Sequence, residues 1–131
     1  MREEFDNLLV KTFPNLYKDR NASARETCMC WGFPGDGWFL IIWNLSEKIE
    51  KIILSLPEDQ RAQVCASQVK EKFGTLRFYM SASSKEIESF IDEAEKLSET
   101  TCEDCGFHGQ TRSGGWIRTL CNGCEIKWKT R

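Results

Sequence analysis

Two Cys-x-x-Cys pairs constrain this sequence more than any other feature. Cys102 and Cys105 form the first pair, fifteen residues follow, and Cys121 and Cys124 form the second. Pairs at this separation are typical of a structural zinc site, because each places two thiolates beside a tight turn and together they complete a tetrahedron. Four thiolates leave no coordination position open for water, so the spacing predicts a structural ion and not a catalytic one. The alternatives are two disulfides or four free cysteines.

The other three cysteines, Cys28, Cys30 and Cys65, bear on the compartment. The total of seven is odd, the charged start Met1–Glu4 lacks a signal-peptide core, and no apolar run reaches membrane-spanning length. These features favour a reducing cytoplasm and no membrane partner. A second metal site lacks a fourth donor, so we expect the three remaining cysteines to be buried thiols.

Length and composition predict a single compact unit. The chain has 131 residues, of which 40% are hydrophobic. We expect an α+β core over residues 1–100, with a structural zinc segment over residues 101–131 packed on it. The net charge of −2 lacks the basic footprint of a general nucleic-acid binder. Beyond Cys102, five basic residues face three acidic ones, and a zinc ion with four thiolates cancels this excess. Nucleic acid is therefore a partner that charge does not favour.

Hydrophobic periodicity predicts three helices. The longest covers residues 38–56, where apolar residues recur at helical spacing until Pro57, and it should be the main core helix. Another begins at a capping box, Ser83–Glu86, and ends near residue 100. A shorter amphipathic helix covers residues 1–13.

A strand and a turn are predicted before the long helix. Residues Cys28–Phe33 suit a short strand, and Pro34–Gly37 must turn because two glycines flank Asp36. Asp36 stands where the N-cap of the helix is expected.

Residues 61–81 are predicted to form a β-hairpin. Apolar and polar residues alternate along both arms, and Lys70–Gly74 lies between them as the turn, with Gly74 in an unusual backbone conformation. On the returning arm, Arg77 and Tyr79 project to the face opposite the apolar residues.

The cysteine-rich segment has the layout of a treble-clef finger. A polar loop covers Phe107–Gly115, a short strand Trp116–Leu120 leads into the second cysteine pair, and Glu125–Arg131 suits a short helix. The predicted fold is therefore α+β: a small antiparallel hairpin packed with two or three helices, plus a C-terminal treble-clef-like zinc knuckle.

Four motifs together carry a resemblance to a known family. They are Trp31-Gly-Phe33 with Gly35-Asp-Gly-Trp38, Val69-Lys-Glu-Lys-Phe-Gly74 with Leu76-Arg-Phe-Tyr79, Thr101-Cys-Glu-x-Cys-Gly106, and Gly114-Gly-Trp-x-x-Thr-Leu-Cys121. The chain resembles, over roughly residues 28–128, a family of small uncharacterised proteins of bacteriophages, prophages and bacteria. It departs from the family pattern at Pro34, where a Glu-Cys dipeptide is expected. The resemblance implies a phage origin, and hence the host cytoplasm, and leaves the activity open.

The candidate ligand-binding residues combine three cations, two aromatic rings and a carboxylate. They are Lys70, Lys72, Arg77, Tyr79, Trp38 and Asp36. Such a set suits a phosphate or nucleotide, because arginine offers paired donors, lysine a point charge, and an aromatic ring a stacking face. The alternative is an ordinary solvated face, on which Lys70 and Lys72 pair with Glu71 or with helix carboxylates.

Catalysis has little support in the sequence. His108 is the only histidine, and we expect it on the surface of the zinc loop. No Ser-His-Asp or Cys-His set is evident, and no carboxylate pair stands out by its spacing. Arg112 and Arg118 bracket a Gly-Gly pair and would contact phosphates, form hydrogen bonds back to the knuckle, or face water.

These observations rank three candidate functions. The first is a non-enzymatic phage-type binding protein, an anti-defence sponge for an anionic nucleotide-like signalling molecule. The second is a zinc-finger regulator that binds nucleic acid or a host protein. An enzyme ranks last, and a homo-oligomer stays open.

Overall fold

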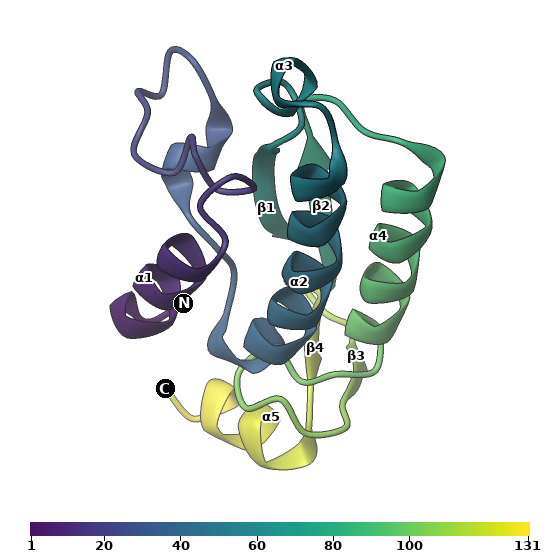
Figure 1. Ribbon diagram of the computed structural model, residues 1–131. Helices are drawn as coiled ribbons and strands as arrows, with labels where there is room; N and C mark the ends of the chain where they lie inside the picture. Colours follow the sequence, from purple (N-terminus) through teal and green to yellow (C-terminus); the bar gives the residue numbers. More distant parts are fainter.

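The computed structural model describes residues 1–131 and shows an α+β fold, which confirms the predicted class (Figure 1). The α-helices are α1 (Glu3–Thr12), α2 (Phe39–Ser55), α3 (Glu58–Arg61), α4 (Lys85–Ser98) and α5 (Asn122–Lys129). Two antiparallel hairpins consist of β1 (Ala66–Lys72) with β2 (Thr75–Met80), and β3 (Gln110–Arg112) with β4 (Arg118–Leu120). Two 3₁₀ turns are η1 (Cys28–Trp31) and η2 (Asp36–Trp38). None of the helices has the length and apolarity needed to cross a membrane.

Helix α2 is the centre of the core, as its periodicity predicts. Its inward residues Ile42, Leu45, Ile49 and Ile53 are all buried. Each such side chain contributes about 1.5–3 kcal/mol through the area it removes from water. Helix α4 lies alongside α2 in Figure 1, and both pack against the β1–β2 hairpin to form one hydrophobic cluster.

Helix α4 also covers the free edge of strand β2. The Ser98 hydroxyl accepts a hydrogen bond from the Leu76 N–H at 2.9 Å, and the Glu95 carboxylate accepts one from the Phe78 N–H at 3.0 Å. These bonds satisfy amides that an edge strand would otherwise expose. The helix is capped by Ser84, one residue later than the capping box predicts.

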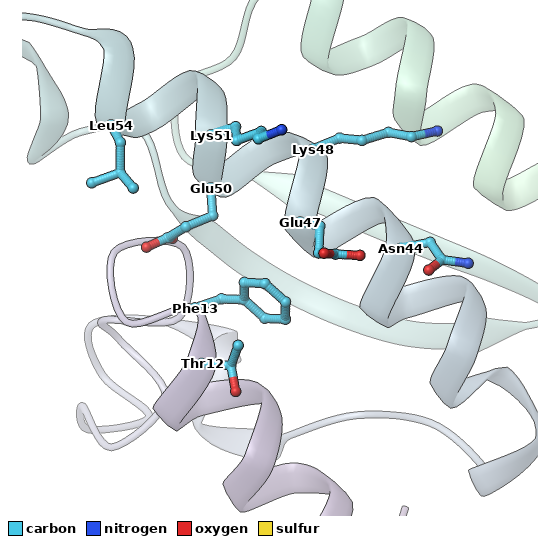
Figure 2. Close-up of a pocket in the computed structure, with 8 residues that line it drawn as sticks. All are labelled: Thr12, Phe13, Asn44, Glu47, Lys48, Glu50, Lys51 and Leu54. Carbon is cyan, nitrogen blue, oxygen red and sulfur yellow. The ribbon is translucent and has the colours of Figure 1, made fainter.

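Helix α1 packs against α2, and a polar hollow marks their junction. Figure 2 shows Thr12 and Phe13 at the end of α1 on one side of this hollow and Glu47 and Glu50 of α2 on the other, whereas Lys48 extends toward α4. Glu50 is buried there, and three hydrogen bonds compensate the burial of its carboxylate. The carboxylate accepts them from the Asn15 N–H, the Asn15 side-chain amide and the Leu16 N–H. The Glu50 side chain thus holds the loop after α1.

Two local predictions before α2 are wrong. Cys28–Trp31 forms a 3₁₀ turn and not a strand, because Thr27 caps the Met29 N–H and Gly32 turns the chain at a φ of 81°. Asp36 does not cap α2. Its carboxylate instead accepts hydrogen bonds from the N–H and Nε of Arg2, at 2.7 and 2.8 Å.

The Gly-Asp-Gly-Trp turn docks directly against the first cysteine pair. The Gly37 N–H donates to the Glu103 carbonyl at 2.9 Å, and the buried Trp38 indole donates to the Thr101 carbonyl at 2.8 Å. A Cβ at Gly37 would overlap the Cys102 carbonyl oxygen. The glycine is therefore required by close backbone approach.

Candidate functional site

The four C-terminal cysteines form a cluster that can bind one metal ion. Their Sγ atoms all lie within 4.8 Å of one another, and those of Cys105 and Cys121 are 3.6 Å apart. A tetrahedral ion with bonds of about 2.3 Å to sulfur requires thiolates about 3.8 Å apart. The cysteines that their spacing predicts to bind one ion therefore lie close enough together to do so. They are Cys102, Cys105, Cys121 and Cys124.

The first cysteine pair lies on a tight backbone knuckle. The Cys102 N–H donates to the Phe107 carbonyl at 2.7 Å, and the Gly106 N–H donates back to the Cys102 carbonyl at 2.9 Å. Gly106 has a φ of 84° and packs against Gly37. Cys102 is buried while Cys105 is exposed, so the cluster has one inner and one outer side.

The second pair lies at the start of α5. The Cys121 sulfur caps this helix and accepts the Cys124 N–H at 3.4 Å. That bond, more than the neighbouring thiols, lowers the pKa of Cys121 to about 7. Loss of solvation raises the pKa values of Cys105 and Cys124.

Two arginines brace the cysteine segment from within. Arg112 donates to the Leu120 carbonyl through Nε and Nη2, at 3.1 and 3.0 Å. Arg118 pairs with Glu103 and Asp104 at 3.1 and 2.7 Å. Burial raises the pKa of Glu103, although the Thr119 N–H and Arg118 oppose that rise. Of the roles expected for these arginines, the structure shows the contact with the knuckle region.

Four of the six predicted ligand-binding residues share the outer face of the β1–β2 hairpin. In the ladder Lys70 lies directly opposite Arg77, Gln68 opposite Tyr79, and Lys72 opposite Thr75. Opposed residues and residues two apart project to the same face. We name Lys70, Lys72, Arg77 and Tyr79 the cationic face.

Little neutralises the charge of the cationic face. Lys70 and Lys72 form no ion pair, and Glu71 projects from the opposite face of β1. Arg77 lies 3.8 Å from Glu95, and both side chains are partly exposed, which makes this a weak pair. The lysine pairing expected of an ordinary solvated face is absent.

Trp38 and Asp36 lie apart from the cationic face. Trp38 is fully buried and bonded to Thr101, so its ring cannot stack on a ligand. Burial opposes ionisation of Asp36, but the hydrogen bonds and charge of Arg2 outweigh it and lower the pKa of this carboxyl. Both residues were expected as companions of the hairpin cations, but their side chains serve the docking of chain segments.

The remaining cysteines and the histidine join no cluster. Cys65 is buried, and its thiol lies 3.5 Å from the Asp19 carboxylate, whereas Cys28 is exposed. The buried-thiol prediction therefore holds for Cys65, is wrong for the exposed Cys28, and is only partly met by Cys30, which is half-buried. His108 is exposed and pairs through its backbone with Thr101, as expected for a loop residue.

One feature that sequence reasoning missed is a group of exposed apolar side chains beside the hairpin tip. Phe73 is 69% exposed and Trp116 is 65% exposed, and with Ile117 they border a surface hollow. Their positions in the sequence could have indicated that they are exposed, since Phe73 lies in a tight turn and Trp116 follows two glycines.

Comparison of the chain with family models, with curated proteins and with solved structures finds no match.

Proposed function

We propose that this chain is a non-enzymatic binding protein that captures an anionic, nucleotide-like molecule on its cationic face. The observation that carries the proposal is the placement of Lys70 directly opposite Arg77. Like charges opposed across a strand pair destabilise it, by an amount comparable to the ~0.2–1 kcal/mol of a favourable pair. A bound phosphate would remove this repulsion and gain charge-assisted hydrogen bonds.

The chemistry of the face fits both parts of a nucleotide. The Arg77 guanidinium can donate two parallel hydrogen bonds to a phosphate, and the lysines add point charges. Tyr79 is 43% exposed and lies two ladder pairs beyond Arg77, on the same face, so its ring is open to a base. The resemblance to phage proteins makes a host signalling nucleotide the preferred ligand and a sponge in the host cytoplasm the preferred role.

Zinc is the ion that the four-cysteine cluster suits best. Four thiolates in tetrahedral reach favour zinc over the hard cations that prefer oxygen ligands. A closed shell of this kind supplies folding energy and no open position for substrate. Elemental analysis of the purified chain should give one zinc per chain, and a different metal or none would contradict the assignment.

A thermal-shift panel of cyclic and linear nucleotides tests the proposed capture. A ligand at 100 times its Kd should add about 2.7 kcal/mol to the free energy of unfolding. Arg77→Gln and Lys70→Gln should abolish the shift, while Lys85→Gln, an exposed lysine on α4, should leave it unchanged. Recovery of the nucleotide intact would agree with a sponge, and chemical change would favour an enzyme. A panel without any shift would contradict the proposal.

A zinc-finger regulator is the second candidate function. It is favoured by the exposed aromatic residues Phe107 and Trp116 on the cysteine segment. Its nucleic-acid form is weakened by the internal bonds of Arg112 and Arg118. A gel shift with DNA and RNA at increasing salt separates it from capture, because nucleic-acid binding should fall steeply with salt.

A further inference from the structure

A hollow of about 300 Å³ lies between the tip of the β1–β2 hairpin and the β3–β4 loop. No residue of the cationic face or of the four-cysteine cluster lines it. Its lining consists of Glu71, Phe73, Gly114, Gly115, Trp116 and Ile117. We name it the aromatic hollow.

The aromatic walls of the hollow are held in place but have little covering. Phe73 has a φ of 54°, the left-handed conformation that bulky residues rarely adopt. Its neighbour Gly74 is anchored, because the Thr119 hydroxyl donates to the Gly74 carbonyl at 2.7 Å. The turn thus keeps a large apolar ring 69% exposed at a backbone cost. A two-residue hairpin turn requires a positive φ at both central residues, and a large ring exposed at such a turn marks a surface that another molecule can cover.

The charge in the hollow is negative. Strand alternation directs Glu71 away from Lys70 and Lys72, so the two faces of β1 carry opposite charges at the tip. The Glu71 carboxylate accepts the Gly74 N–H through Oε2 at 2.7 Å and forms no ion pair. Glu103 lies near enough to feel its charge. A carboxylate beside two aromatic rings is suited to a cation.

We propose that the aromatic hollow receives an arginine side chain from an extended peptide segment of a partner protein. A guanidinium can stack on the Trp116 ring while it donates to Glu71. The Lys72 ammonium lies 5.9 Å from the Phe73 ring centroid, so Trp116 is the ring that has no cation of the chain itself over it.

The glycines favour a peptide over a free small cation. A Cβ at Gly114 or Gly115 would have no atom within 4 Å, so the rim beside Trp116 is open to an approaching backbone. Small-molecule sites bury most of their ligand, whereas the rings here remain largely exposed. This inference goes beyond the capture of an anion, which occupies the opposite face of the same hairpin.

Amide and indole NMR of the ¹⁵N-labelled full chain tests the proposal. The probe is the pentapeptide acetyl-Gly-Ser-Arg-Ser-Gly-amide. The control peptide carries citrulline in place of arginine, which keeps the shape of the side chain without its charge. The arginine peptide should shift the Trp116 indole and the Gly114 and Gly115 amides in a saturable way, and the citrulline peptide should bind at least tenfold more weakly.

Three variants test whether the peptide binds in the aromatic hollow. Trp116→Ala and Glu71→Gln should each weaken the arginine peptide at least tenfold, and Glu71→Gln retains an oxygen for the Gly74 N–H. Phe107→Ala is the matched control, because Phe107 is a 75% exposed ring on the same segment outside the hollow. Equal binding of both peptides, or shifts that avoid Trp116, would overturn the proposal. Binding of free arginine amide as tight as that of the peptide would overturn the assignment of a peptide partner.

Discussion

The Gly-Asp-Gly-Trp turn and the tip of the β1–β2 hairpin both bring glycines against the cysteine segment, but they use their side chains in opposite ways. Gly37 approaches Cys102, and Gly74 approaches Arg118 and Thr119. Beside Gly37, the Trp38 side chain is buried. Beside Gly74, the Phe73 side chain faces solvent, as does the cationic face farther along the strands.

The comparison distinguishes a turn that docks chain segments together from a hairpin that can bind a ligand. A turn whose backbone and side chains are both engaged by another segment has nothing left to offer a ligand. The hairpin tip docks through one glycine, so the Phe73 side chain and the cationic face stay at least partly exposed. Aromatic and acidic residues beside glycines therefore indicate function only where the side chains remain exposed.

Removal of the metal should have the largest effect on this pair of regions. Chelation or Cys102→Ser should lower the free energy of unfolding by at least about 3 kcal/mol, because metal binding supplies folding energy to residues 101–131. The loss should reach Trp38, whose indole bonds to Thr101, before the centre of α2. Hydrogen exchange checks this order. Collapse of the whole chain at once would contradict a core of residues 1–100 that persists.

Gly37→Ala should be the most damaging single change in the turn. The new Cβ would collide with backbone atoms of Cys102 and Glu103, which cannot rotate away, at a cost of about 3 kcal/mol. Gly115→Ala is the matched control, since its Cβ meets nothing within 4 Å. Urea unfolding measures both, and equal midpoints would show that the turn does not dock as described.

Trp38→Phe should cost less, about 2 kcal/mol. It removes one buried hydrogen bond and leaves the Thr101 carbonyl without a partner. The zinc content should remain unchanged, because no metal ligand is altered. A variant as stable as the wild type would show that the indole N–H does not hold the segment.

The smallest effect should come from Asp36→Asn. Arg2 lowers the pKa of Asp36 in the folded chain, so its stabilisation is present above the ordinary value of 3.8 and is lost as pH falls through the lower folded pKa. The stability of the variant should therefore decline less than that of the wild type as the pH falls. Melting temperatures between pH 2.5 and 6 test the difference, and parallel curves would contradict the pairing.

Sequence reasoning predicted features that depend on local spacing. Apolar periodicity located α2, strand alternation located the hairpin, and the cysteine spacing located the cluster. The hairpin turn is shorter than expected, since β1 runs through Lys72 and leaves Phe73-Gly74 as a two-residue turn. The ladder thereby includes three more pairs, Lys70 with Arg77, Glu71 with Leu76 and Lys72 with Thr75.

Features that depend on distant partners could not be predicted in this way. Arg2 is 34 residues from Asp36, and Trp38 is 63 residues from Thr101. Asp36 therefore had a plausible local partner in the helix N-terminus and took a distant one. The same limit placed Trp38 among ligand-binding residues, because its burial depends on where the cysteine segment docks.

The most direct test of the division between docking and binding is one titration with two variants. The nucleotide that gives the largest thermal shift is titrated into folded Lys70→Ala and folded Trp38→Phe, each measured well below its melting temperature. Our account predicts that Lys70→Ala weakens the nucleotide at least tenfold and that Trp38→Phe binds it within a factor of two of the wild type. Retained affinity in Lys70→Ala together with lost affinity in Trp38→Phe would contradict it.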